Sequence, residues 1–193
     1  MARPKAFTEN TALEKAMNTF WKKGYHDTSM QDLVDNMSIN RASMYDTFGD
    51  KHQLYLKSLE NYRDINQCNL AKAIENEIVE REKIRIILRV LVDEALNDID
   101  NKGCFFTNAT LEMLPSDTDV STIVLDNLCQ MKAMLTDIIK NAQAKGEIQN
   151  NQTPESLADF VQCNIGGIRI LAKARPSAQQ LYGVVDNMMS VLK

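Results

Sequence analysis

Hydrophobic residues recur at helical spacing along almost the whole chain. The clearest example is Met30, Leu33, Val34 and Met37, which fall at positions i, i+3, i+4 and i+7 and form a complete helical stripe. The four prolines and seven glycines are few, and most of them fall between the periodic segments. The pattern therefore predicts an all-α protein of about nine helices.

The first two helices are expected to be short. Thr11 followed by Glu14 is a capping-box signature that predicts the start of the first helix, and Gly24 is a stop signal at its end. Ser29 can cap the second helix, with Asp32 three residues further on. The apolar face of the first helix is formed by Leu13, Met17, Phe20 and Trp21.

A third short helix follows after only two residues. Asn40 is a good N-cap, and the flanking Ile39 and Met44 are spaced as a hydrophobic staple. Met44 and Phe48 then point inward, and Gly49 ends the helix. Two short helices joined by a tight turn predict a helix-turn-helix motif.

The outward face of this third helix carries polar and aromatic groups, namely Arg41, Ala42, Tyr45 and Asp46. A solvated surface would show the same residues, so composition alone does not decide their role. The cap, the staple and the tight turn favour a recognition helix that enters the DNA major groove.

The remaining helices are expected over residues 52–78, around 84–95, from Gly103 to Pro115, over 120–145, from Pro154, and near the C-terminus. Residues 1–50 are predicted to form the helix-turn-helix DNA-binding domain. Residues 51–193 are predicted to form a second, helical domain. The boundary near residue 50 is expected to be a covalent hinge, because the fourth helix is expected to belong to both parts and no low-complexity linker separates them.

Residues 24–59, "GYHDTSMQDLVDNMSINRASMYDTFGDKHQLYLKSL", resemble the N-terminal domain of TetR/AcrR-type bacterial transcriptional regulators. The matching features are Gly24-Tyr25, Thr28-Ser29, the helix 30–37, Met44-Tyr45, Phe48, Lys51 and Leu54. The family usually has glycine in the turn where this chain has Ser38. A left-handed conformation at a non-glycine residue is expected to cost about 1 kcal/mol.

The motif geometry and the resemblance imply a set of DNA contacts. Arg41 could read guanine or hold a phosphate, and Asp46 could accept a hydrogen bond from cytosine N4. Other polar groups of the motif are expected to hold the DNA backbone. The predicted DNA-binding residues are Thr28, Ser29, Gln31, Asn40, Arg41, Ala42, Ser43, Tyr45, Asp46 and Lys51.

Gly166 and Gly167 lie within the penultimate helix, where each costs about 1 kcal/mol relative to alanine. Close approach of a second helix would explain this, and the resemblance implies a homodimer built from the last two helices. Monomer core is the alternative explanation for some of these residues. The predicted interface comprises Phe160, Asn164, Gly167, Ile168, Leu171, Leu181, Val184, Val185 and Met188.

The resemblance also implies that residues 51–193 are a ligand-binding and dimerisation domain. A cavity for a small-molecule effector would be enclosed by the fourth to seventh helices. An effector there would shift the fourth helix and change the spacing of the two recognition helices in a dimer. Ordinary core packing is the alternative for each candidate, especially the methionines. The candidates are Tyr62, Cys104, Phe105, Phe106, Asn108, Met113, Cys129, Met131, Met134, Gln162 and Cys163.

Charge alone does not reveal a nucleic-acid partner. The net charge is −4, and residues 1–52 carry seven basic and seven acidic side chains. DNA contacts must therefore depend on locally arranged groups. The four cysteines are scattered and the two histidines lie far from them, so we expect neither a metal site nor a cofactor. No apolar run is long enough to span a membrane and the N-terminus does not resemble a signal peptide, which predicts a cytoplasmic protein.

Three other functions are alternatives. An enzyme is not expected, because the sequence has no G-x-S-x-G, H-E-x-x-H or P-loop motif, and Glu112 and Asp117 are ordinary as a carboxylate pair. A helical adaptor that binds protein rather than DNA is the second alternative. The third is a redox or electrophile sensor acting through Cys104, beside Lys102 and near a helix start, against which stands the frequent burial of inert thiols.

Overall fold

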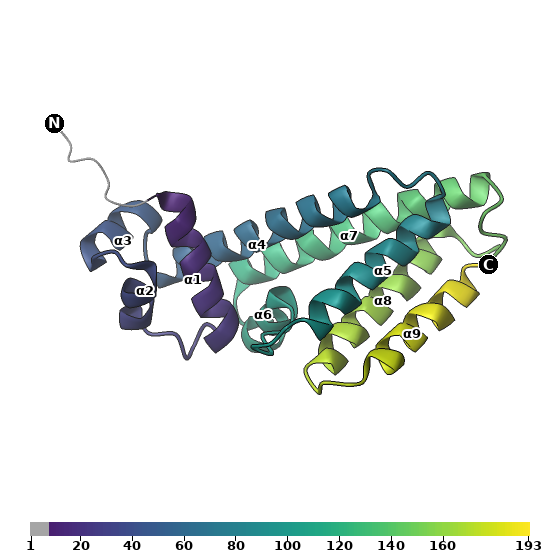
Figure 1. Ribbon diagram of the computed structural model, residues 1–193. Coiled ribbons are helices and arrows are strands. Elements are labelled where there is room, and N and C mark those ends of the chain that lie inside the picture. The colour runs from purple at the N-terminus through teal and green to yellow at the C-terminus, as the bar shows by residue number, and fades with distance from the viewer. Residues whose placement is uncertain (1–7) are drawn as a thin grey trace. The chain divides into compact units, whose positions relative to one another are not determined.

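The computed structural model describes residues 8–193 and contains nine α-helices and no strand in that range. The predicted all-α fold is confirmed (Figure 1). None of the helices in the described range is long and apolar enough to cross a membrane. The helices are α1 Glu9–Lys23, α2 Met30–Met37, α3 Arg41–Phe48, α4 Lys51–Ile74, α5 Glu80–Leu96, α6 Phe105–Met113, α7 Thr118–Ala144, α8 Pro154–Ala172 and α9 Ala178–Val191.

Contacts divide the chain into two compact units. Unit 1 is the chain up to Ile65 together with Cys104–Val124, and unit 2 is Asn66–Gly103 together with Leu125–Lys193. The helices α4 and α7 each run through both units. The sequence-based boundary at residue 50 stays a prediction, and residues 1–7 of its first domain lie outside the described range.

Unit 1 is built around the inner faces of its short helices. Buried Phe20 of α1, Leu33 of α2 and Met44 of α3 belong to one cluster with Tyr55 of α4 and Phe105 of α6. The ring centroids of Phe105 and Tyr55 lie 5.5 Å apart at an interplanar angle of 89°, a favourable edge-to-face geometry. The helix α6 thus shares a core with the helix-turn-helix, although α4 and α5 separate it from α3 along the chain.

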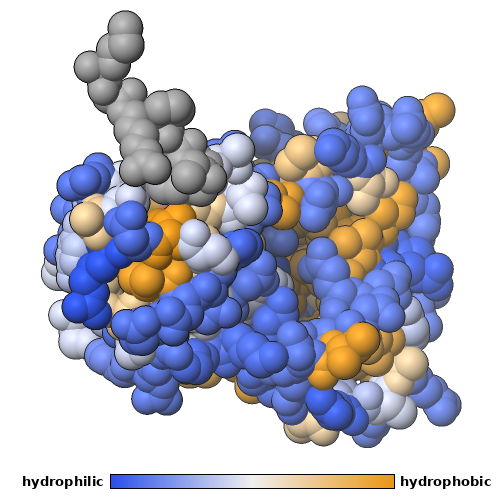
Figure 2. Space-filling model, turned by 60° about the vertical axis from the view of Figure 1, so that its left-hand side comes forward, coloured by the Kyte–Doolittle hydropathy of each residue, from blue (hydrophilic) through white to orange (hydrophobic). Residues whose placement is uncertain are grey.

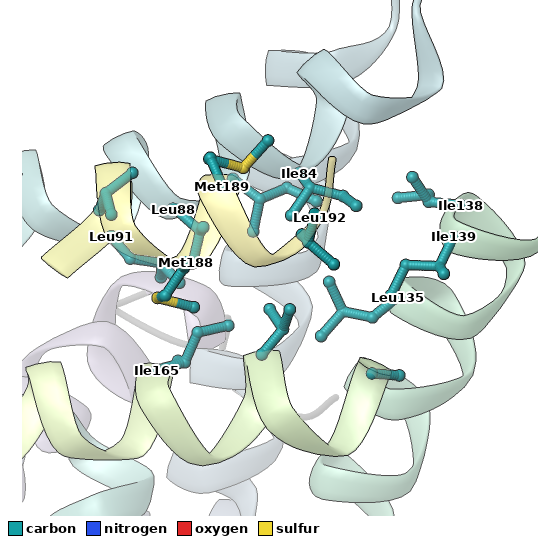
Figure 3. Close-up of a cluster of buried hydrophobic side chains, with 14 of the residues drawn as sticks. Ile84, Leu88, Leu91, Leu135, Ile138, Ile139, Ile165, Met188, Met189 and Leu192 are labelled. Carbon is teal, nitrogen blue, oxygen red and sulfur yellow. The ribbon is translucent and has the colours of Figure 1, made fainter. Parts of the chain in front are cut away.

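Unit 2 has its own core, formed where α5, α7, α8 and α9 bring their apolar stripes together (Figure 3). Ile84 and Leu88 of α5 lie in the same buried cluster as Leu135 of α7. Ile165 of α8 and Met188 of α9 belong to it as well. The side chain of Arg81 donates hydrogen bonds to the carbonyl oxygens of Met189 (2.8 Å) and Leu192 (2.8 Å). These bonds satisfy carbonyl groups that the end of α9 leaves without helical partners.

One predicted helix start was wrong. The helix α1 begins at Glu9 after Thr8, so Thr11 lies inside the helix and does not cap it. The Thr8 hydroxyl donates to the Thr11 hydroxyl at 2.6 Å, and Thr8 itself makes no side-chain cap bond. The expected stop at Gly24 is confirmed.

Candidate nucleic-acid interface

The start of α2 is fixed by the capping box that the sequence predicted. The Ser29 hydroxyl accepts a hydrogen bond from the Asp32 backbone N–H (3.1 Å), and the Asp32 carboxylate accepts one from the Ser29 backbone N–H (2.8 Å). Lys23 of α1 forms an ion pair with Asp32 at 2.6 Å. Hydrogen bonds from Lys23 and Ser29 hold the pKa of the Asp32 carboxyl well below its usual value. The N-terminus of α2 is therefore held in one geometry.

The turn between α2 and α3 contains the left-handed residue that the sequence predicted. Ser38 has φ 59° and ψ 40°, a conformation that disfavours most residues other than glycine. The Lys15 ammonium donates to the Ser38 hydroxyl at 3.3 Å, and the Ile39 side chain is buried. Ser38 thus takes the tight-turn conformation without glycine.

The helix α3 begins as expected at the Asn40 cap, whose side-chain oxygen accepts a hydrogen bond from the Ser43 backbone N–H at 2.8 Å. Ile39 and Met44 are both buried, in agreement with the predicted staple. Met44 and Phe48 anchor the inner face in the core of unit 1. This short helix is therefore held in place by its cap and by buried side chains rather than by its own propensity.

The opposite face of α3 is exposed, as predicted. Arg41, Ala42 and Asp46 are all exposed, and Tyr45 retains 46% of its accessible surface. A large aromatic side chain left half in water on a two-turn helix is available to a partner. The face offers a guanidinium, a phenol and a carboxylate, which together can donate to and accept from base edges.

One predicted contact residue does not fit this role. Thr28 is buried, and its hydroxyl donates a hydrogen bond to the Gly24 carbonyl oxygen at 2.6 Å. It therefore closes the turn between α1 and α2 and is not presented to a phosphate. Gln31 is exposed, with its amide donating to Asp35 at 2.8 Å, and remains accessible.

Lys51, at the start of α4, lies over the ring of Tyr25 with 4.4 Å between its ammonium and the ring centroid. Partial desolvation lowers the pKa of Lys51, and the charges of Glu112 and Asp27 oppose that shift. Burial, followed by the charges of Asp117 and Asp50, raises the pKa of the Tyr25 phenol. Stacking on an aromatic face positions the lysine while leaving donors for a phosphate.

One group of side chains in the described residues could hold a metal ion by distance. It consists of His52, Asp117 and Asp119, whose possible ligand atoms lie within 4.8 Å of one another. His52 Nε2 is 2.8 Å from an Asp117 oxygen. Although desolvation opposes it, hydrogen bonds from the Val120 N–H and His52 keep the pKa of the Asp117 carboxyl low. The group lies at the starts of α4 and α7, where helix dipoles disfavour a cation, so the arrangement fits a hydrogen bond between His52 and Asp117 better than a metal site.

The effector-pocket candidates fall into separate environments. Cys104, Phe105, Phe106, Met113 and Tyr62 are buried in the core of unit 1. Core packing already accounts for their burial, and their role in ligand binding stays a prediction.

The other pocket candidates lie elsewhere. Met131 and Met134 pack against the core of unit 2, whereas Cys129 and Cys163 are exposed. The amide of Gln162 donates to the Leu128 carbonyl oxygen at 3.0 Å, and Asn108 is half-buried. A cavity of about 350 Å³ in unit 2 is lined by none of these candidates but by Ala95, Leu96, Asp98, Ile99, Asn101, Ala172, Arg175, Pro176 and Leu181.

The predicted dimer residues divide into two groups. Four of them are buried in the core of the protomer, so their side chains are not accessible to a second copy. These four are Ile168, Leu181, Val185 and Met188, of which Figure 3 shows Met188. Monomer core, the alternative explanation, accounts for the burial of these four. The residues that remain exposed or half-buried are Phe160, Asn164, Gly167, Leu171 and Val184.

Sequence reasoning missed Glu112, which it treated as an ordinary surface carboxylate. In the structure the Glu112 carboxylate accepts hydrogen bonds from the backbone N–H groups of Tyr25 (3.0 Å) and His26 (2.8 Å). The partners lie 87 and 86 positions away in the chain, so no local sequence pattern signals the contact.

Comparison with known proteins supports a DNA-binding role. Residues 12–57 match the family described as "Bacterial regulatory proteins, tetR family", and residues 81–187 match "Tetracyclin repressor-like, C-terminal domain". The chain is 29% identical to the HTH-type transcriptional regulator YezE of Bacillus subtilis strain 168, covering 100% of both chains. It is 29% identical to the HTH-type transcriptional repressor ComR of Escherichia coli K12, covering 97% of this chain and 90% of ComR.

The fold is also shared with a regulator solved on DNA. A cysteine-substituted variant of the TetR family regulator CifR, in complex with 26-base-pair operator DNA, has a TM-score of 0.88 and 26% identity, and the match covers 100% of both chains. The family and these relatives are transcriptional regulators rather than enzymes, which confirms the expectation of no catalysis. The matched regions span the helix-turn-helix and most of the C-terminal helices, and the chain belongs to the TetR family as a DNA-binding transcriptional regulator.

Proposed function

We propose that the protein is a repressor that binds a pseudo-palindromic operator as a homodimer in the bacterial cytoplasm and is released by a small molecule. The main observation in favour of DNA binding is the structure of α3. This helix is capped and anchored in the core, and its exposed face presents Arg41, Tyr45 and Asp46. ComR is named as a repressor, and the CifR variant binds a 26-base-pair operator, which supports this assignment. An effector releases DNA if it binds the DNA-free conformation more tightly than the DNA-bound one.

Selection of genomic fragments by the purified protein tests this function. We expect retention of a small set of fragments, and a footprint with two half-sites about one helical turn or a simple multiple apart, because a two-fold dimer reads a two-fold site. Retention of no fragment above a scrambled-sequence control at physiological salt would favour the helical adaptor instead. The Cys104 sensor is not favoured, because that thiol is buried at the start of α6.

An exposed face of α8 supports the homodimer. Phe160, Asn164, Gly167 and Leu171 follow one another at helical spacing, and Phe160 and Leu171 are exposed to 37% and 55%. Figure 2 shows hydrophobic areas on an otherwise mostly hydrophilic face of the molecule. A Cβ atom built on Gly167 would meet nothing within 4 Å, so close packing inside the protomer does not explain this glycine.

The variant Gly167→Arg is expected to convert the dimer into a monomer without unfolding it. The added side chain has room in the protomer, but it would hold two helices apart and leave a charge in an apolar interface. Light scattering at micromolar concentration should show half the wild-type mass, with unchanged helical circular dichroism. Ala71→Arg, at an exposed position of α4, is the matched control. A wild-type mass for Gly167→Arg would remove this face from the interface.

A further inference from the structure

A carboxylate from α6 holds the turn that leads into the helix-turn-helix. The Glu112 side chain accepts hydrogen bonds from two successive backbone N–H groups, those of Tyr25 (3.0 Å) and His26 (2.8 Å). Hydrogen bonds with an ionised acceptor are about twice as strong as those between neutral groups. All three residues belong to unit 1, so the contact lies inside one compact body.

The backbone of the turn is shaped to admit this carboxylate. Gly24 has φ 88°, which L side chains rarely adopt, and a Cβ atom there would lie 2.9 Å from one Glu112 oxygen and 3.1 Å from the other. A side chain at position 24 would therefore displace Glu112 as well as strain the backbone. Gly24 thus provides both the end of α1 and the space for the carboxylate.

The same turn is closed from its inner side by Thr28. The Thr28 hydroxyl donates to the Gly24 carbonyl oxygen at 2.6 Å, and the Thr28 backbone N–H donates to the Tyr25 carbonyl oxygen at 3.3 Å. The next residue, Ser29, is the N-cap of α2. A change in the conformation of residues 24–28 would therefore move the N-terminus of α2. Because α2 is the first helix of the helix-turn-helix, its position relative to α3 would change as well.

We propose that Glu112 is a positioning residue for DNA recognition, acting through the turn between α1 and α2. It touches no DNA in this proposal. Its carboxylate sets the conformation of residues 25 and 26, which fixes the start of α2 and so the orientation in which the helix-turn-helix meets a groove. A displacement of α6 from this turn would remove both acceptors at once, which makes the contact a point where the C-terminal part of the chain acts on DNA affinity. The inference rests on the proposed function.

The variant Glu112→Gln tests the proposal with little change in shape. The amide keeps one acceptor oxygen but turns an NH₂ group towards a backbone donor, so one of the two hydrogen bonds is lost. We expect operator affinity to fall about tenfold, equivalent to about 1.4 kcal/mol. Hydrogen exchange at the Tyr25 and His26 amides should become at least severalfold faster, whereas amides in α5 and α9 of unit 2 should exchange at wild-type rates.

Glu60→Gln is the matched control, because Glu60 is exposed on α4 in the same unit. It should change neither operator affinity nor amide exchange. Glu112→Asp retains the charge on a shorter side chain and should lie between Glu112→Gln and wild type. Affinity is measured on protein that is folded at the assay temperature. A difference in affinity among these variants therefore reports the positioning of the helix-turn-helix and not a loss of folded protein.

The outcomes are distinguishable. If Glu112→Gln binds the operator like wild type, or if the Tyr25 and His26 amides exchange equally fast in both proteins, Glu112 has no positioning role. If Glu112→Gln does not fold, fast exchange of these two amides in the wild-type protein would equally refute the proposal. If wild-type protein retains no DNA, the proposed function fails, and the exchange data still report whether Glu112 holds the turn.

Discussion

Replacing Phe105 by alanine should lower the free energy of unfolding of unit 1 by about 3–5 kcal/mol. Phe105 is 1% exposed, and its ring contacts those of Tyr55 and Tyr62 at centroid distances of 5.5 and 5.7 Å. Removal of the ring leaves a cavity among side chains from α4 and α6, since a close-packed interior collapses only in part. Because the same core anchors α3, operator binding should weaken at temperatures where unit 1 begins to unfold.

Urea denaturation followed by tryptophan fluorescence measures this effect. The chain has a single tryptophan, Trp21, and its ring lies 4.9 Å from that of Tyr62 and 6.5 Å from that of Phe105, so the signal reports on unit 1. Leu111→Ala is the control on the same helix, because Leu111 is 73% exposed and should change stability by less than about 0.5 kcal/mol. A similarly small effect for Phe105→Ala would show that the side chain lines a space and does not pack, as the effector-pocket assignment requires.

The recognition face of α3 gives the second large effect. Arg41→Ala and Tyr45→Ala should each weaken operator binding about 5- to 150-fold, because a good contact to a base edge contributes about 1–3 kcal/mol. Both side chains are exposed, so thermal stability should stay within about 0.5 kcal/mol of wild type. Binding is measured by fluorescence anisotropy on operator and on scrambled duplexes at several salt concentrations.

Lys51→Ala provides the contrast within this experiment. A phosphate contact carries no sequence information, so its loss should weaken binding to both duplexes alike and reduce the salt slope by about 1. Arg41→Ala and Tyr45→Ala should instead reduce the preference for the operator. Wild-type operator affinity in both α3 variants would contradict the assignment of α3 as the recognition helix.

The sequence determined the local features of the helix-turn-helix, because each of them depends on residues within one or two helical turns. Spacing alone indicated the α2 capping box, the Asn40 cap, the staple of Ile39 with Met44, and the ends at Gly24 and Gly49. The exposed face of α3 followed from the same periodicity, since a helix that buries Met44 and Phe48 must expose Tyr45. The predicted start of α1 at Thr11 was wrong, because Thr8 and Thr11 lie three positions apart and either could precede the first helical turn. The helix begins after Thr8.

Tertiary structure alone decided which distant segments share a core. No pattern within residues 105–113 distinguishes packing against α1 and α4 from lining a ligand cavity, because both demand apolar side chains. The same ambiguity affected α8 and α9, where Ile168 and Met188 proved to be core and Gly167 stayed open. Helical periodicity identifies a buried face but does not name the surface that covers it.

The hydrogen-bond partners of charged and polar side chains depended on the tertiary structure even more strongly. Thr28 was expected at a phosphate, yet its hydroxyl donates to the Gly24 carbonyl oxygen. Glu112 accepts hydrogen bonds from backbone groups 87 and 86 positions away in the chain. A hydrogen bond forms over about 3 Å, so its partner is fixed only when folding brings the two atoms together. The sequence thus determined the helices, the caps of α2 and α3 and the exposed face of α3, whereas the folded chain decided which groups hold that face in position.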